Sequence, residues 1–189
     1  MEERVESDLL RQLKFEEMGR FVPGTTTRPT HPIRVLLHNI RSIYNVGSIF
    51  RTGDGMGVEH IYLSGYTGTP EHRALRKTAL GAEEIIPWSQ HQDPLEVIRA
   101  ARQSGHTICA LEITNKSVFV RDIRPRHFPM LLVLGHEVEG IQEDVLAACD
   151  MSVTLPQYGA KASLNVAVAF GIAAYGLVDQ LERHAKETG

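Results

Sequence analysis

The sequence has little cysteine and no long, strongly hydrophobic segment. Only two cysteines, Cys109 and Cys149, occur in 189 residues; both stand where small buried residues belong and neither has metal-ligand spacing, so we predict a reducing compartment and no disulfide framework. The uncharged segment from Ala162 to Val178 is rich in alanine and glycine and falls short of the roughly 20 strongly apolar residues that span a membrane. The acidic beginning MEERVESDLL lacks the apolar core of a secretory signal. We therefore predict a cytoplasmic protein that does not span a membrane.

An excess of positive charge is also absent. The formal net charge is -3, which argues against a protein that coats nucleic acid by bulk attraction and leaves only local basic clusters for such binding. Three clusters occur, around Arg34, around Arg73 and around Arg124. Each of them is equally well explained as solvated surface charge. The candidate contacts to nucleic acid in the first two clusters are Arg28, Arg34, Arg41, Arg73, Arg76 and Lys77.

Short apolar runs alternate with helical patterns after residue 30. The runs of strand length are 33–40, 59–65, 106–113, 130–135 and 151–156, and helical patterns lie at 45–57, 70–80, 94–105 and 143–149, with a further helix beginning at Ser163. This alternation predicts an α/β fold in which helices flank a parallel sheet. The length suits one domain, 31–189, preceded by an amphipathic N-terminal helix and a linker within 1–30.

Polar residues follow three of the five predicted strands, in RSIYN, HEVEGI and QYGAKASLN. Ligands of parallel sheets bind beyond the carboxyl ends of the strands, so we expect these segments to meet. Asn45 is placed to cap its helix and Arg51 to point toward the strand ends, while Gly135 lets backbone approach a ligand closely. Glu137 can accept hydrogen bonds from amides or from Arg51. Each segment also has a purely structural interpretation. The segment 45–57 is then a capped surface helix with a solvated arginine, and the segment from Ser163 is a core helix with Ser163 as its N-cap.

Several well-known binding motifs are missing. The glycines of GDGMG, at 53–57, come at the end of a helical pattern, whereas a dinucleotide-binding loop needs them between a strand and the start of a helix. They are better explained as a helix C-terminus followed by a turn. GAKAS lacks P-loop spacing, no HExxH occurs, and the nine histidines form no cluster with metal-ligand spacing. A nucleotide-binding oxidoreductase, phosphoryl transfer and metal-dependent hydrolysis therefore lose support, and we predict no metal.

Three segments together resemble a known family. NIRSIYNVGSIFR at 39–51, LVLGHEVEGI at 132–141 and LPQYGAKASLNVAVA at 155–169 are similar in order and spacing to the three motifs of the SpoU/TrmH family of RNA ribose 2′-O-methyltransferases, in the SPOUT class. The resemblance runs from about residue 33 to residue 178. TPEHRALRKTALGAEE, between the first two motifs, also looks like short members of this family.

The resemblance implies a deep C-terminal trefoil knot, an exception to the rule that chains avoid knots, and a homodimer. It also implies S-adenosylmethionine as the cofactor, held largely by backbone groups of the knot loops. By motif position, those loops carry Leu111, Glu112, Leu134, Gly135, Leu155, Pro156, Gln157, Ser163, Leu164 and Asn165.

The implied reaction transfers a methyl group to a ribose 2′-hydroxyl of tRNA or rRNA. Arg51 corresponds to the arginine treated as catalytic in the family, but a guanidinium offers donors and no acceptor, so our hypothesis is that it stabilises the developing alkoxide rather than acting as a base. Asn45 would fix the ribose or Arg51, and Glu137 would orient Arg51 or a loop amide. Ser163 and Asn165 would shape the entrance of the site.

Two other functions stay open on the sequence alone. One is a knotted RNA-binding or assembly protein without turnover, and the other is a methyltransferase of the same fold that acts on a base. Three residues depart from the family pattern: His136 stands where Asn or Ser is frequent, Gln157 where Met is common and Ala167 where Ser is common. His136 is the departure that bears most on function, because it could meet the RNA or cover the cofactor.

Overall fold

The computed structural model describes residue 12, residues 30–161 and residues 163–187. The predicted N-terminal helix and Arg28 lie outside the described residues, so both stay predictions. The division into 1–30 and 31–189 likewise stays a prediction.

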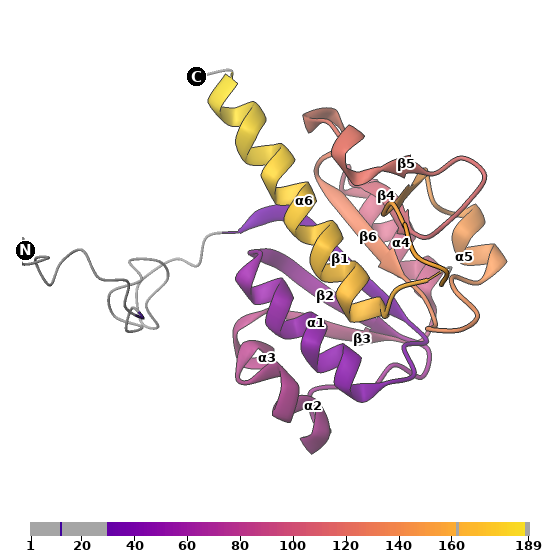
Figure 1. The fold of residues 1–189 in the computed structure, drawn as a ribbon. Coiled ribbons are helices and arrows are strands. Elements are labelled where there is room, and N and C mark those ends of the chain that lie inside the picture. The colour runs from indigo at the N-terminus through magenta and orange to yellow at the C-terminus, as the bar shows by residue number, and fades with distance from the viewer. Residues whose placement is uncertain (1–11, 13–29, 162, 188–189) are drawn as a thin grey trace, which may run out of the picture.

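A parallel sheet forms the centre of the molecule (Figure 1). Within the described residues it has seven strands: β1 (His31–His38), β2 (Val58–Ser64), β3 (Trp88–His91), β4 (Thr107–Leu111), β5 (Val118–Phe119), β6 (Met130–Leu134) and β7 (Met151–Thr154). Their order is β3-β2-β1-β6-β4-β7-β5, and every pairing is parallel. The predicted parallel sheet is confirmed. The edge strands β3 and β5 were not predicted, because the polar WSQH and a two-residue strand carry no apolar run.

Helices cover both faces of this sheet (Figure 1). One face packs against α1 (Ile43–Gly55), α2 (Arg73–Ala79), α3 (Ala82–Ile85) and α6 (Val166–Glu187), and the other against α4 (Pro94–Gln103) and α5 (Glu143–Ala147). Short 3₁₀ turns lie at Val120–Asp122 and Pro125–His127. The predicted α/β class, with helices flanking the sheet, is therefore confirmed.

The central strand β1 shows why its sequence is an apolar run. Ile33, Val35 and Leu37 face the side of α1 and α6, and Leu36 faces the side of α4, all with no exposed surface. A strand buried on both faces cannot alternate apolar with polar residues. From α6, Phe170 is also fully buried, and burying such a side chain contributes about 1.5–3 kcal/mol.

Two helices begin at other residues than predicted. Ser42 caps α1, because its side-chain oxygen accepts a hydrogen bond from the N–H of Asn45 at 3.4 Å, so the prediction of Asn45 as the cap is wrong. At α6, Asn165 Oδ1 accepts from the N–H groups of Ala167 at 2.9 Å and Val168 at 3.3 Å. The prediction of Ser163 as the cap is therefore also wrong, since this role needs an acceptor directly before the first helical residue.

The GDGMG segment ends α1 as predicted. The helix runs to Gly55, and Gly57 then adopts a φ of 63° as the chain turns into β2. A positive φ is accessible to glycine without a steric cost. These glycines therefore shape a turn.

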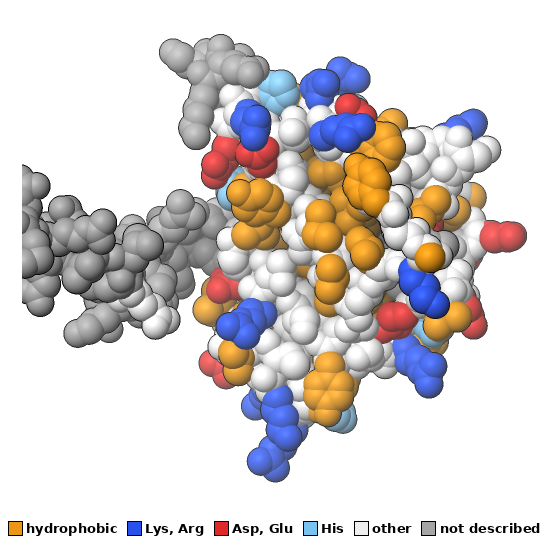
Figure 2. Space-filling view, in the orientation of Figure 1, with side chains coloured by type: hydrophobic (Ala, Val, Ile, Leu, Met, Phe, Trp, Pro, Cys, Tyr) orange, Lys and Arg blue, Asp and Glu red, His pale blue; other side chains and the backbone are white. Residues whose placement is uncertain are grey.

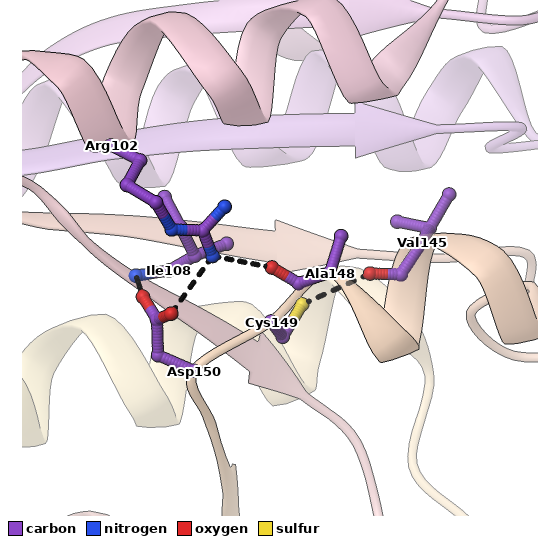
Figure 3. Close-up of polar contacts among 6 residues, drawn as sticks. All are labelled: Arg102, Ile108, Val145, Ala148, Cys149 and Asp150. Carbon is purple, nitrogen blue, oxygen red and sulfur yellow. Dashed lines mark hydrogen bonds and ion pairs between the residues drawn. The ribbon is translucent and has the colours of Figure 1, made fainter.

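An arginine in the last turn of α4 joins the helices on the second face to the amino ends of two strands (Figure 3). Arg102 Nη2 donates to the carbonyl oxygen of Ala148, at the end of α5, at 2.7 Å and to Asp150 Oδ1 at 2.8 Å. The other carboxylate oxygen of Asp150 accepts from the N–H of Ile108 in β4 at 2.8 Å. These contacts fix α4 and α5 at the end of the sheet opposite the site described next.

Both cysteine thiols are free, and the pKa of each is raised. Burial raises the pKa of Cys109 to about 12. Burial, together with the neighbouring charge of Asp150, raises the pKa of Cys149 to about 11, and its sulfur donates to the carbonyl oxygen of Val145 at 3.3 Å (Figure 3). Because the thiolate is the reactive form, neither cysteine suits nucleophilic chemistry at neutral pH.

Candidate active site

A cavity opens over the carboxyl ends of β4, β6 and β7, where ligands of parallel sheets bind. Its walls are the segments that follow these three strands and the first turn of α6. Seven of the residues predicted to contact the cofactor line it: Leu111, Glu112, Gly135, Leu155, Gln157, Ser163 and Leu164. Three others do not: Leu134 is buried in the core, and Pro156 and Asn165 lie beside the lining residues along the chain. Of the three polar strand ends predicted to meet, those after β6 and β7 line the cavity, and the one after β1 does not line it but contacts the β6 loop through Glu137.

The loop after β6 forms one wall of the cavity and depends on Gly135. The N–H of His136 donates to the carbonyl oxygen of Gly140 at 3.0 Å, and the N–H of Gly140 donates back to the carbonyl oxygen of His136 at 2.9 Å. A Cβ on Gly135 would lie 2.5 Å from the carbonyl oxygen of Gly140. Across the loop, Glu112 Oε2 accepts from the N–H of Ile141 at 3.2 Å. The wall therefore has a defined shape that a larger residue at Gly135 would disturb.

Glu137, in the same loop, binds the start of α1. Its Oε2 accepts from the N–H of Arg41 and its Oε1 from the N–H of Ser42, both at 2.9 Å, and Oε1 also accepts from the side-chain amide of Asn45 at 2.9 Å. Burial works to raise the pKa of Glu137, but the hydrogen bonds from Ser42, Arg41 and Asn45 outweigh it, so the pKa lies below its ordinary value. Glu137 therefore stays ionised at neutral pH and ties the β6 loop to α1.

The side chain of Asn45 extends this network to α6. Asn45 donates through Nδ2 to Glu137 and accepts through Oδ1 from Asn165 Nδ2 at 3.1 Å. Asn165 Oδ1 in turn accepts from the first N–H groups of α6. The resulting chain Glu137–Asn45–Asn165, which we call the polar chain, joins residues up to 120 positions apart and holds the N-termini of α1 and α6 together beside the cavity.

Arg51 lies on α1 but does not belong to the polar chain or to the cavity wall. It is exposed and does not line the cavity, and it lies seven residues after Tyr44, on the same outer face of the helix. Within the described part of the chain, Arg51 makes neither a hydrogen bond nor an ion pair with Glu137. Glu137 was predicted to bind either backbone amides or Arg51, and in the structure it binds the backbone amides of Arg41 and Ser42. The catalytic role of Arg51 stays a prediction.

The chemistry of the cavity suits S-adenosylmethionine. Leu111, Leu155 and Leu164 offer apolar contacts for a planar adenine, and the Gly135 loop brings backbone N–H and C=O groups to the wall. The carboxylate of Glu112 lies at the same wall and suits a ligand with positively charged amino and sulfonium groups. Among the described residues, no group of three or more His, Cys, Asp and Glu side chains is arranged to bind a metal ion.

The predicted RNA contacts differ in their surroundings. Arg34 lies near the amino end of β1, away from the cavity, and pairs with Glu59 at 3.1 Å. Arg41 is exposed and directly precedes the cap of α1. The other three, Arg73, Arg76 and Lys77, are exposed on α2. Figure 2 shows Lys and Arg side chains at the end of the molecule that carries α2 in Figure 1.

Some residues of the cavity were not predicted from the sequence. Val138 lies in the second motif, Thr154 directly precedes the third motif, and Ala169 is the last residue of the third. His136, which the sequence marked as able to meet the RNA or cover the cofactor, lines the cavity as well. These residues could have been predicted from the sequence because each lies in or next to a motif whose other residues were predicted to line the site. Ser42, which organises the start of α1, could have been found from its position three residues before Asn45, the usual spacing between a cap and the N–H that it accepts from.

A parallel sheet with a small-molecule cavity over its strand ends defines a cofactor-binding α/β protein. Residues 32–175 match the model of the SpoU rRNA Methylase family, so the chain belongs to this family. The predicted family is confirmed.

Curated relatives include tRNA and rRNA methyltransferases. The chain is 29% identical over 174 residues to the tRNA (guanosine(18)-2′-O)-methyltransferase of Thermus thermophilus, covering 91% of this chain and 82% of the relative. It is 27% identical over 150 residues to the 23S rRNA (guanosine-2′-O-)-methyltransferase RlmB of Pseudomonas aeruginosa, covering 79% of this chain and 59% of the relative. Among solved structures, the AdoMet-bound rRNA methyltransferase from Sinorhizobium meliloti superposes with a TM-score of 0.74 at 28% identity, covering 82% of this chain and 59% of that one.

Proposed function

We propose that this protein transfers a methyl group from S-adenosylmethionine to a ribose 2′-hydroxyl of tRNA or rRNA. The observation that carries the proposal is the cavity itself: its walls come from the second and third family motifs and from the end of β4, and Asn45 of the first motif holds the adjoining segments together. The predicted enzyme class, an S-adenosylmethionine-dependent RNA methyltransferase, agrees with the family to which the chain belongs.

The residues of the site would position the reactants. S-adenosylmethionine, when bound, supplies a methyl group already activated by a positively charged sulfur. The loops after β4, β6 and β7 hold the cofactor through Gly135 and the leucines of the cavity. The polar chain keeps the loop after β6 and the N-termini of α1 and α6 in one arrangement, so the ribose can be aligned for direct displacement. Ser163, exposed at the cavity, shapes its entrance.

Arg51 would act on the 2′-oxygen from the outer face of α1. A guanidinium remains charged at neutral pH and only donates hydrogen bonds, so Arg51 holds the ribose or an adjacent phosphate and stabilises the negative charge that develops on the oxygen. The proton then passes to phosphate or water.

The protein would act as a homodimer. Val168, Ile172 and Tyr175 recur at helical spacing on α6, and Leu164 lies two residues before the helix; these four residues, which we call the α6 stripe, are between 41% and 66% exposed. Figure 2 shows hydrophobic side chains gathered along the line of α6. Leu164 also lines the cavity, so a second copy packed on the stripe would lie against the cavity entrance. Tyr44 is exposed as well, and Arg51 shares its face of α1. An exposed apolar patch of this kind is typical of an interface.

The RNA would be bound by Arg41 beside the cavity and by the cations of α2. Among the described residues, no helix is long and apolar enough to cross a membrane. The cytoplasmic location stays a prediction.

Methyl transfer into RNA tests the proposal. The protein is incubated with tritiated S-adenosylmethionine and total RNA from cells that lack the gene, and the products are digested to nucleosides. We expect label in 2′-O-methylated nucleosides. Label in a base would favour a base methyltransferase, and RNA binding without label would favour an assembly protein.

Arg51 has its own test. We expect Arg51→Ala to lower kcat at least about a hundredfold, because charge stabilisation of this kind is worth about 3 kcal/mol, while cofactor affinity stays within twofold. Arg51→Lys retains the charge but not the planar donor set and should recover part of the rate. Near wild-type turnover of folded Arg51→Ala would remove Arg51 from the mechanism.

A further inference from the structure

Two aromatic rings, one in the cavity wall and one beside it, have no role in the reaction described above. His136 lines the cavity in the loop after β6, and Tyr66 follows β2 at the same edge of the sheet. Their ring centroids are 6.3 Å apart with planes at 78°, an edge-to-face pair. Tyr66 is 61% exposed, so one side of this pair is open to a ligand that approaches the cavity.

The orientation of the His136 ring is set by the backbone. Its Nδ1 accepts from the N–H of Val138 at 3.1 Å and from the N–H of Glu139 at 3.0 Å. Nδ1 is therefore the acceptor nitrogen of a neutral ring, and Nε2 carries the proton. Nε2 lies on the side of the ring away from the loop backbone, and within the described residues it has no hydrogen-bond partner. His136 thus presents a fixed donor at the cavity.

The backbone also holds Tyr66 in place. Its N–H donates to Asn39 Oδ1 at 3.2 Å, and the preceding Gly65 has a φ of 61°, which turns the chain directly after β2. An exposed aromatic ring on an anchored backbone is a suitable stacking surface for an unpaired base. The nearby cation Arg41 is exposed and suits the phosphates on either side of such a base.

We propose that Tyr66 and His136 hold the nucleobase of the nucleotide that is methylated. The base stacks on the Tyr66 ring, and His136 Nε2–H donates to a carbonyl oxygen or ring nitrogen on its edge. RNA-modifying proteins recognise unstacked bases in this way, by aromatic stacking combined with edge hydrogen bonds. This inference rests on the proposed function, because it assigns the base that accompanies the reacting ribose.

Three variants separate the ring from its polar atoms. Tyr66→Ala removes the stacking surface, and Tyr66→Phe is its matched control because the ring remains. His136→Asn retains a side-chain oxygen that can accept from Val138 and Glu139, as Nδ1 does, while it removes the Nε2 donor. The loop should therefore keep its shape in His136→Asn.

Methyl-transfer kinetics on total RNA from cells that lack the gene, with cofactor affinity measured by calorimetry, test the inference. We expect Tyr66→Ala to raise KM for RNA at least about fivefold, since stacking is worth about 1–3 kcal/mol per base, with Tyr66→Phe within twofold of the wild type. His136→Asn should raise KM or change which 2′-O-methylated nucleosides form. Cofactor affinity should not change in the two Tyr66 variants, because Tyr66 does not line the cavity. Wild-type KM and product pattern in both Tyr66→Ala and His136→Asn would overturn the inference.

The experiment distinguishes a failure of the proposed function from a failure of this inference. If the wild-type protein methylates no ribose, filter binding of the same RNA takes the place of the kinetics. Weaker binding by Tyr66→Ala but not by Tyr66→Phe would then support the base contact, and equal binding by all three proteins would overturn it.

Discussion

At the scale of single residues, Glu137 shows how a predicted catalytic side chain can act through structure. Its carboxylate accepts two backbone N–H groups and one amide at the start of α1, at distances of 2.9 Å. A carboxylate placed there also suits the positive end of the helix dipole. Glu137 therefore acts on the reaction as a positioning residue that keeps the β6 loop and α1 together.

The substitution Glu137→Gln tests this role. An amide retains one acceptor oxygen but turns an NH₂ group toward a backbone N–H, so we expect the free energy of unfolding to fall by about 1 kcal/mol at neutral pH. Urea unfolding measures the difference. Glu139→Gln, an exposed carboxylate in the same loop, is the matched control and should not change stability.

The stability difference between the wild type and Glu137→Gln should depend on pH. Because hydrogen bonding lowers the pKa of Glu137 in the folded state, its contribution is complete above the ordinary carboxyl value of 4.5 and is lost as the pH falls through the lowered value. The stability difference between the wild type and Glu137→Gln should therefore shrink in acid below pH 4.5. A difference that grows in acid would contradict the assignment.

Gly135→Ala addresses the wall of the cavity. The added Cβ would lie 2.5 Å from the carbonyl oxygen of Gly140, and both are rigid backbone positions, so the loop must move. We expect cofactor affinity, measured by calorimetry, to fall at least about tenfold, since overpacking of this kind costs about 1–3 kcal/mol. Gly55→Ala, where a Cβ meets nothing within 4 Å, should bind the cofactor as the wild type does.

At the scale of elements, α6 has two different faces. Phe170, Ala173 and Leu177 pack into the core, and the α6 stripe faces outward. Its polar beginning, through Asn165, joins the start of α1. One helix therefore contributes to the core, to the polar chain and to the surface on which we place the second subunit.

The substitution Ile172→Asp tests the dimer. Ile172 is 49% exposed in the middle of the α6 stripe, so a charge there should separate the subunits with little effect on the fold of each. Size-exclusion chromatography with light scattering should show a dimer for the wild type and a monomer for the variant. Ile85→Asp, at an exposed isoleucine on α3, should remain dimeric. A wild type that is monomeric at micromolar concentration would refute the dimer.

At the scale of the whole molecule, RNA binding must come from local charge, because the formal net charge is -3. We expect the double reversal Arg73→Glu with Arg76→Glu to weaken RNA binding at least about tenfold and to lower the salt slope of binding by about 2, with cofactor affinity unchanged. Filter binding over a salt series measures both quantities. Arg99→Glu, on α4 at the other face of the sheet, is the control. Unchanged RNA affinity in the double variant would exclude α2 from the interface.

Much of the fold could be predicted from the sequence because both faces of the central sheet are buried. Runs such as 33–40 and 130–135 are apolar for that reason, and all five predicted strands are present. The edge strands β3 and β5 escaped prediction because they are short or polar and their pairing depends on neighbours distant in sequence. The second and third family motifs located the cavity, because the residues that line it follow the buried strands β6 and β7.

The partners within the site could not be predicted in this way. Local pattern placed caps at Asn45 and Ser163, but the structure uses Ser42 and Asn165, because the amide of Asn45 is committed to Glu137 and Asn165 across the fold. Such a choice depends on contacts between residues more than 90 positions apart, which no local spacing reveals. The knot implied by the family resemblance stays a prediction for the same physical reason, since threading is a property of the whole path.

The span of the polar chain bears on how the protein is made. Asn45 and Asn165 are 120 residues apart, and Asn165 is oriented by the first N–H groups of α6. When translation has reached β7, the chain holds most of the core residues but none of the contacts that Asn165 makes with Asn45 and with α6. The nascent chain acquires the complete cavity wall only after α6 has emerged and docked, so we expect methyl transfer only from the finished chain.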